Sequence, residues 1–159
     1  MKILRALILT VLALAPARFV AACSCVTLPG GAKPAAAALL NNTDAVFVGT
    51  VIDAGELRLP LNPTHTYVEN RLVLLRVSKS WKGISDSHVI IATGMGGGDC
   101  GFPFEKGKEY LVFARRADAY IPGQFTTSIC MATQPTAKAA GLIDELGQSQ
   151  FSFDSAAWH

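Results

Sequence analysis

The chain has 159 residues, with 14 Lys and Arg against 12 Asp and Glu. Three of the basic residues and none of the acidic ones lie in the first 22 positions, so the remaining 137 residues (159 less 22) carry 11 basic and 12 acidic side chains. A charge this close to zero argues against a general nucleic-acid binder, for which a basic domain is expected, and this length suits one domain with an adequate core.

The first 22 residues have the pattern of a secretory signal peptide. Lys2 and Arg5 give a positive start, residues 6–15 are largely apolar, and small residues precede Cys23. The apolar run is shorter than the roughly 20 residues that span a bilayer, which argues against a membrane anchor. We expect cleavage between Ala22 and Cys23 and a secreted protein, in an extracellular or periplasmic compartment.

Cleavage at that point makes Cys23 the first residue of the mature chain, in the sequence Cys23-Ser24-Cys25. A terminal cysteine presents an α-amine, a carbonyl and a thiol, which could chelate a metal, form a disulfide or accept a lipid. The lipid is an alternative because Val20-Ala21-Ala22-Cys23 also resembles a lipobox, which would anchor the protein to the cell envelope. Lipidation would occupy the Cys23 sulfur, usually block its amine and leave another cysteine unpaired, which favours ordinary cleavage.

All four cysteines follow the leader, and an even number in an oxidising compartment predicts two disulfides with three possible connectivities. A ring between Cys23 and Cys25 would be very tight, so each is expected to pair with a distant partner. A zinc site is not favoured, because only one residue separates Cys23 from Cys25 and no histidine lies beside Cys100 or Cys130. We therefore expect no resident cofactor.

The mature chain begins with a predicted helix and a predicted strand. Pro34 opens an Ala- and Leu-rich stretch that ends at Asn41-Asn42, which suits a short helix. Residues 44–53 are rich in β-branched and aromatic residues and predict a strand. Gly49 within this strand indicates a bulge or a sharp bend, as small barrels need.

The rest of the chain predicts four more strands, a second helix and an aromatic tail. A polar loop is expected at 55–66, a glycine loop carrying Cys100 at 94–101, a helix at 136–146, and strands at 67–81, 88–93, 110–114 and 124–130. The tail, residues 149–159, is expected to be docked or disordered. Five strands with glycine bends and flanking helices favour an all-β domain at 23–148, a small Greek-key barrel of the OB-fold type.

Six segments stand out by their order and spacing. They are Cys23-Ser24-Cys25, Asp44 to Val51, Val77 to Gly83, Cys100 to Phe104, Gly107 to Val112, and Thr127 to Cys130. Together they resemble the netrin-like (NTR) module, specifically the N-terminal domain of the tissue inhibitors of metalloproteinases (TIMPs). The resemblance covers Cys23 to about Cys130, which is most of the mature chain.

The resemblance implies a five-stranded OB-fold barrel stapled by the disulfides Cys23–Cys100 and Cys25–Cys130. In the family, the α-amine and carbonyl of the first cysteine chelate the catalytic zinc of a protease, and the next side chain enters its specificity pocket. By position these roles fall to Cys23 and Ser24. Cys25, Val26, Thr27 and Asp99 would belong to the edge that contacts the protease.

Two departures from the family separate the possible functions. The animal inhibitors have a third disulfide in this domain, and larger side chains where this chain has Gly96-Gly97-Gly98. The first hypothesis is therefore a secreted, monomeric inhibitor of zinc metalloproteinases, and the alternative is a non-inhibitory envelope binding or interaction module. Contact with a membrane is expected only if Cys23 is lipidated.

An enzyme is not expected, because His65, His88 and His159 are scattered along the chain and the cysteines are used in disulfides.

Overall fold

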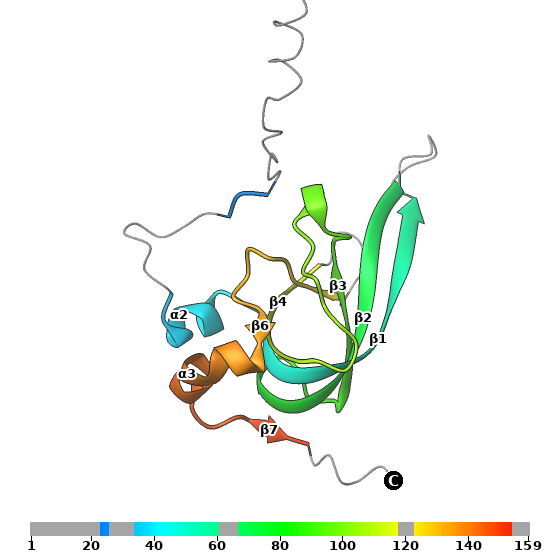
Figure 1. The fold of residues 1–159 in the computed structure, drawn as a ribbon. Coiled ribbons are helices and arrows are strands. Elements are labelled where there is room, and N and C mark those ends of the chain that lie inside the picture. The colour runs from blue at the N-terminus through cyan, green and yellow to red at the C-terminus, as the bar shows by residue number, and fades with distance from the viewer. Residues whose placement is uncertain (1–22, 26–33, 61–66, 118–122, 154–159) are drawn as a thin grey trace, which may run out of the picture.

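The computed structural model describes residues 23–25, 34–60, 67–117 and 123–153 (Figure 1). The expected signal peptide and its cleavage residue Ala22, together with Val26 and Thr27, lie outside the described residues. The elements are α2 (Ala36–Asn41), β1 (Ala45–Pro60), β2 (Tyr67–Lys82), β3 (His88–Thr93), the 3-10 helix η2 (Gly97–Asp99), β4 (Glu109–Arg116), β5 (Phe125–Thr126), β6 (Gln134–Pro135), α3 (Thr136–Leu146) and β7 (Phe151–Ser152).

The strands form one sheet that closes on itself. Its order is β1-β2-β3-β5-β4, and β1 also pairs with β4. All of these pairings are antiparallel except the one between β3 and β5. The short strands β6 and β7 add to β4 and β2, and α2 and α3 lie together on one side of the sheet (Figure 1). The expectation of an all-β domain with flanking helices is confirmed.

Irregular pairing allows β1 to form hydrogen bonds with both β2 and β4. Its register against β2 shifts between Val46 and Phe47, between Val48 and Gly49, and between Val51 and Asp53. A Cβ atom on Gly49 would lie only 3.2 Å from the carbonyl oxygen of Arg76 and from the Cβ of Leu75. The bend predicted at Gly49 is therefore present, and the strand approaches β2 there more closely than a side chain would comfortably allow.

Alternate residues of β1 point into two separate apolar clusters. Phe47 and Val51 belong to the barrel core, which also takes in Ala45 and residues from β2, the turn after it, β3, the loop before β4, β4 and β5. Val46 and Val48 face the other way and pack with Trp81 and the fully buried Ala139 of α3. Because β1 is covered on both faces, its first half reads as a continuous apolar run rather than an alternating one.

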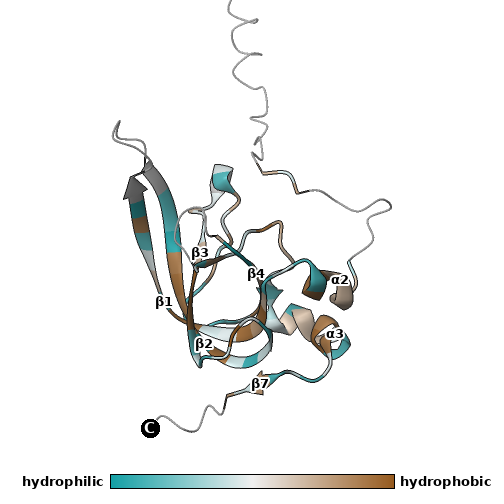
Figure 2. Cartoon of the chain, turned by 180° about the vertical axis from the view of Figure 1, so that it is seen from behind, coloured by the Kyte–Doolittle hydropathy of each residue, from teal (hydrophilic) through white to brown (hydrophobic). Residues whose placement is uncertain are grey.

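The first strand runs further than the sequence indicates. The loop expected at 55–66 is wrong for its first residues, since Gly55 to Pro60 continue β1 and pair in register with Tyr67 to Leu72. We call residues 55–60 with 67–70 the arm, because β2 pairs with β3 only from Arg71 onward. The arm projects beyond the barrel (Figure 1) and is largely hydrophilic in colour (Figure 2). An ion pair between Arg58 and Glu69 joins its two strands.

The end of the chain also differs from the expected pattern. The strand predicted at 124–130 is reduced to Phe125–Thr126. Thr127 N still donates to Ala92 O in β3 (3.0 Å), but Ile129 N donates to Cys100 O in the glycine loop. Part of the predicted tail is docked: β7 pairs with β2, with hydrogen bonds from Gln150 N to Ser80 O (2.8 Å) and from Phe153 N to Ser78 O (3.0 Å). Phe153 packs against the barrel core.

Candidate functional site

Two disulfides hold the segment Cys23–Cys25 against the barrel. Cys23 is bonded to Cys100, 77 residues away, and Cys25 to Cys130, 105 residues away. These are the pairs that the family resemblance implies. Ser24 between them is exposed. Two disulfides are characteristic of an oxidising extracellular or periplasmic compartment.

We call the segment Cys23–Cys25 and the two loops that bind it, residues 94–101 and 128–130, the N-terminal edge. A hydrogen bond from Ile129 N to Cys100 O (3.0 Å) joins the two loops directly. The Cys23 sulfur lies 3.7 Å from the carbonyl oxygen of Gly98. Because a disulfide sulfur carries no proton, this is a packing contact rather than a hydrogen bond. The three pieces are thus bound to each other as well as to the sheet.

The carboxylate of Asp99 organises the loop that carries Cys100. It accepts hydrogen bonds from Met95 N (2.6 Å), Gly96 N (2.8 Å) and Gly101 N (3.2 Å). Desolvation raises the pKa of Asp99, but the N–H groups of Met95, Gly101 and Gly96 outweigh this effect and hold its pKa below the usual value. Asp99 therefore lies on the expected edge, with its carboxylate turned into its own loop.

Glycines in this loop are needed for close approach. A Cβ atom on Gly94 would lie 2.6 Å from the Asp99 carboxylate, and one on Gly101 would lie 2.1 Å from the carbonyl oxygen of Gly94. Cys100 has φ +61, in the left-handed region that non-glycine residues adopt at a cost. The loop is thus folded tightly around Asp99, which fixes the direction from which Cys100 meets Cys23.

Buried threonines connect the N-terminal edge to the barrel. Thr93 at the end of β3 donates to Thr127 O (2.9 Å) and accepts from Phe102 N (2.7 Å), just after Cys100. The Thr127 hydroxyl donates to Phe113 O in β4 (2.8 Å) and lies 2.8 Å from that of Thr133. All three threonines are at least nine-tenths buried. Buried hydroxyls with full sets of partners keep such a network rigid.

Sequence reasoning missed these threonines and two apolar side chains on the N-terminal edge. Met95 is 39% exposed and Ile129 is 44% exposed, one on each loop beside the cysteines. Thr93 ends a predicted strand, Thr127 lies within the strand predicted at 124–130 and Thr133 follows it, so nothing in the sequence indicated that their hydroxyls are buried. Of the predicted site residues, Cys23, Ser24, Cys25 and Asp99 are brought together on this edge.

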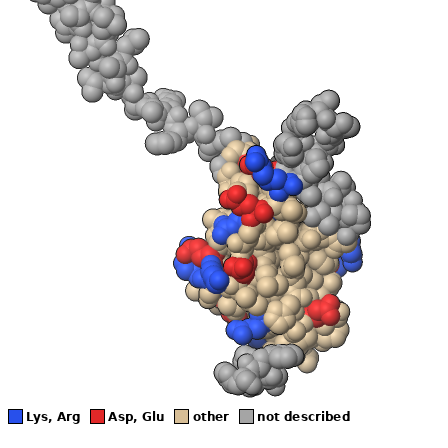
Figure 3. Space-filling model, turned by 90° about the vertical axis from the view of Figure 1, so that its right-hand side faces the viewer, with Lys and Arg blue, Asp and Glu red and all other residues tan. Residues whose placement is uncertain are grey.

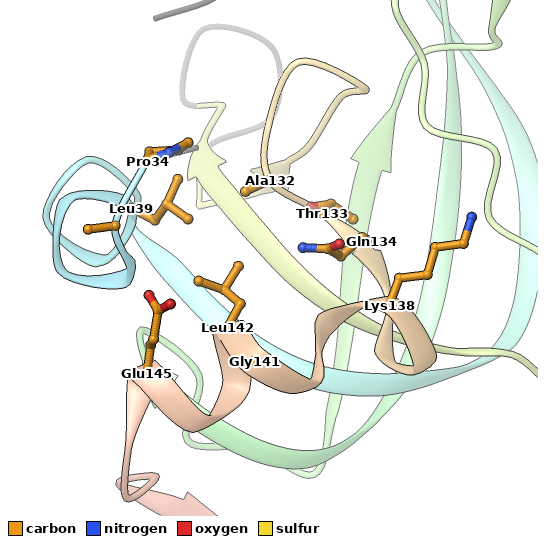
Figure 4. Close-up of a pocket in the computed structure, with 10 residues that line it drawn as sticks. Pro34, Leu39, Ala132, Thr133, Gln134, Lys138, Gly141, Leu142 and Glu145 are labelled. Carbon is orange, nitrogen blue, oxygen red and sulfur yellow. The ribbon is translucent and has the colours of Figure 1, made fainter. Parts of the chain in front are cut away.

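A separate cavity of about 680 Å³ lies between α2 and α3. Figure 4 shows Leu39 and Leu142 on its walls, with Lys138 and Glu145 toward opposite ends of α3. One Glu145 oxygen accepts a long hydrogen bond from Ala36 N (3.4 Å), which links the two helices. The cavity lies on the helix side of the sheet and shares no lining residue with the N-terminal edge.

The described residues contain no group of three or more His, Cys, Asp or Glu side chains that could hold a metal ion. His88, the one histidine within the described ranges, is exposed on β3 with its Nδ1 atom 3.1 Å from the Ser87 hydroxyl. No helix among these residues is long and apolar enough to cross a membrane.

In comparisons with known proteins, no family model matches the chain and no curated protein matches it.

Proposed function

We propose that this protein is a secreted, TIMP-like inhibitor of zinc metalloendopeptidases, in which the free α-amine and carbonyl of Cys23 bind the zinc of the target. The observation that carries the proposal is the double attachment of Cys23 and Cys25 to two loops that are themselves hydrogen-bonded together. This arrangement presents the first residue of the mature chain at a rigid, exposed edge.

We assign the barrel to the OB-fold as part of this proposal. A ring of five strands in the order β1-β2-β3-β5-β4, closed by pairing of β1 with β4, supports the assignment. The short β5 and its parallel pairing with β3 are compatible with a barrel that is only partly regular at that point. The netrin-like module, of which the TIMP N-terminal domain is an example, has the OB-fold.

The proposed chemistry uses the open position of a catalytic zinc site. Such a site has three protein ligands and a water molecule, which an amine and a carbonyl from one residue can displace as a five-membered chelate. The amine must be unprotonated to bind zinc, and a free α-amine has a pKa of about 8. Binding at neutral pH therefore releases a proton, and inhibition should strengthen as the pH rises toward 8.

Rigidity and exposure favour this use of the N-terminal edge. Because disulfides already fix Cys23 and Cys25, little conformational entropy is lost when the segment docks into a protease cleft. The exposed Ser24 is free to enter a specificity pocket. The apolar Met95 and Ile129 on either side supply surface that a partner can cover.

The alternative is a non-inhibitory binding or interaction module of the cell envelope, with or without a lipid anchor on Cys23. Its support is the lipobox-like sequence before Cys23. A sulfur atom cannot carry both a lipid and a disulfide, so the Cys23–Cys100 bond favours the unmodified form. The intact mass of the mature protein shows whether Cys23 is lipidated, because diacylation and N-acylation add three fatty chains whereas each disulfide removes two hydrogens. The inhibition test separates the inhibitor from an unlipidated module.

The inhibition test compares the mature protein with a form that has one alanine added before Cys23. Both are assayed against a panel of zinc endopeptidases, with a serine protease as a control. We expect the native form to inhibit at least one zinc enzyme and the extended form to lose at least 100-fold in potency, about 2.7 kcal/mol. Equal potency of the two forms would rule out chelation by the amine.

A further inference from the structure

The outer edge of the arm is an unpaired strand edge. β4 pairs with β1 only as far as Thr50, and Val51 then exchanges hydrogen bonds with the loop before β4, at Lys108 O (3.0 Å) and Gly107 N (2.8 Å). From Asp53 to Leu57, no described strand lies along this side of β1. An edge of this kind presents N–H and C=O groups that can pair with another strand.

The order of charges along this edge is self-complementary, so two antiparallel copies of the edge would place opposite charges across from each other. Glu56 and Arg58 lie two residues apart and so project on one face of β1. If two copies of the edge pair antiparallel about a twofold axis at Leu57, Glu56 of each copy lies opposite Arg58 of the other. Opposite charges directly across an antiparallel pair are stabilising. Arg58 already pairs with Glu69, but its guanidinium has five N–H donors and can serve two carboxylates.

The other face of the arm continues an apolar strip. Leu57 lies on the same face as Gly55, which is opposite Leu72 in β2, and Leu74 is opposite Ile90 in β3. Leu57, Leu72 and Leu74 are half-buried, and Ile90 is 49% exposed. Edge-to-edge pairing at Leu57 would bring the two copies of this strip side by side and cover part of it.

We propose that a second copy of this chain occupies this edge, so that the two arms form one continuous sheet across a twofold axis at Leu57. A twofold interface requires a surface that is complementary to itself, which the order Glu56-Leu57-Arg58 provides. Pro60 has no N–H group, which limits the pairing to the residues before it. On the face seen in Figure 3, charges of both signs are interspersed and form no large field of one sign.

Sedimentation equilibrium of the disulfide-bonded protein over a wide range of concentration tests the proposal. We expect the weight-average mass of the wild type to rise from one chain toward twice that value. Glu56→Arg places arginines opposite each other across the interface, and Arg58→Glu places glutamates opposite each other, so each variant alone should keep the mass of one chain. An equimolar mixture of the two variants should again double the mass, because one chain then supplies two arginines to the interface and the other supplies two glutamates.

Two control variants separate the interface from the arm's own stability. Glu69→Gln removes the same intrachain ion pair as Arg58→Glu but leaves the edge charges intact, so it should still dimerise. Lys138→Glu changes a charge on α3 and should also still dimerise. Thermal unfolding of each variant checks that it is folded. A wild type that keeps the mass of one chain at every concentration overturns the proposal, as does a dimer that survives both Glu56→Arg and Arg58→Glu.

Discussion

At the scale of a single residue, the carboxylate of Asp99 accepts hydrogen bonds from three backbone N–H groups of the loop beside Cys23. The exposed position limits the strength of each bond, but their convergence determines the path of the chain from Gly94 to Gly101. A residue expected at the contact with a partner is thus used to shape the loop. Apart from Asp99 and the disulfide-bonded Cys130, the exposed side chains on this edge are Ser24, Met95 and Ile129.

Acid should weaken this loop. A carboxyl whose pKa is lower in the folded than in the unfolded state stabilises the fold above the unfolded pKa, near 3.8, and loses that effect as the pH falls through the folded pKa. The amide resonances of Met95 and Gly96 should therefore shift below pH 3.8 in the wild type. Asp99→Asn, which keeps the shape without the charge, should abolish the shift and lower the free energy of unfolding at pH 7 by about 1 kcal/mol. An unchanged shift in Asp99→Asn would assign it to another group.

Two buried hydroxyls should respond oppositely to removal. The Ser80 hydroxyl is buried without a hydrogen-bond partner among the described residues, whereas that of Thr93 accepts from Phe102 N and donates to Thr127 O. Ser80→Ala should leave the free energy of unfolding unchanged or raise it by up to about 1 kcal/mol, and Thr93→Val should lower it by about 1–3 kcal/mol. Urea denaturation measures both. Destabilisation by Ser80→Ala would indicate a bound water that completes the site.

At the scale of elements, β7 contributes to the domain although it lies within the predicted tail. Ending the chain at Gln148 removes two backbone hydrogen bonds to β2 and the packing of Phe153 on the barrel core. We expect the free energy of unfolding to fall by about 1–3 kcal/mol, with the fold retained. Phe153→Ala should account for much of that loss, whereas Phe151→Ala, at an exposed position, should change it by less than about 0.5 kcal/mol. Equal effects of the two substitutions would contradict this packing.

Elements with clear sequence boundaries were predictable. The strand at His88–Thr93 and the helix at Thr136–Leu146 have the predicted bounds, because the apolar run of the strand ends at Gly94 and the helix lies between Pro135 and Gly147. Of the arm, residues 67–70 lie in the predicted strand 67–81, but residues 55–60 were not predictable, because they are held by pairing with β2 rather than by burial. β6 was missed for a similar reason, because Gln134 and Pro135 give no strand signal and pair only where β4 offers an edge.

The cysteines of the candidate site were predictable from the sequence, whereas the hydrogen bonds that hold them in place were not. Cys23, Ser24 and Cys25 are adjacent in sequence, so their grouping needed no tertiary information. Their placement relative to Asp99 and Ile129 depends on hydrogen bonds between loops more than twenty residues apart. The local sequence pattern does not predict such bonds, because a threonine at the end of a strand has the same sequence context whether its hydroxyl is buried or exposed.

At the scale of the whole molecule, closure of the sheet makes the barrel strands more resistant to local unfolding than the arm. The first half of β1 and the middle of β4 pair with strands on both sides, while the arm pairs only with itself. Hydrogen exchange at a concentration that keeps the chain single should be slowest around Phe47 and Val112 and fastest in the arm. Comparable protection in peptides from the arm and from β4 would contradict this picture.

The disulfide pattern also has a consequence for the order in which the molecule is made. Cys23 and Cys25 precede all of the described strands, whereas Cys100 follows β3 and Cys130 follows β5. In a chain that is exported from its N-terminus, the first cysteines to meet an oxidant must wait for partners that arrive after most of the barrel. The two disulfides of this segment can therefore form only late in synthesis, and a chain interrupted between Cys100 and Cys130 leaves Cys25 without its partner.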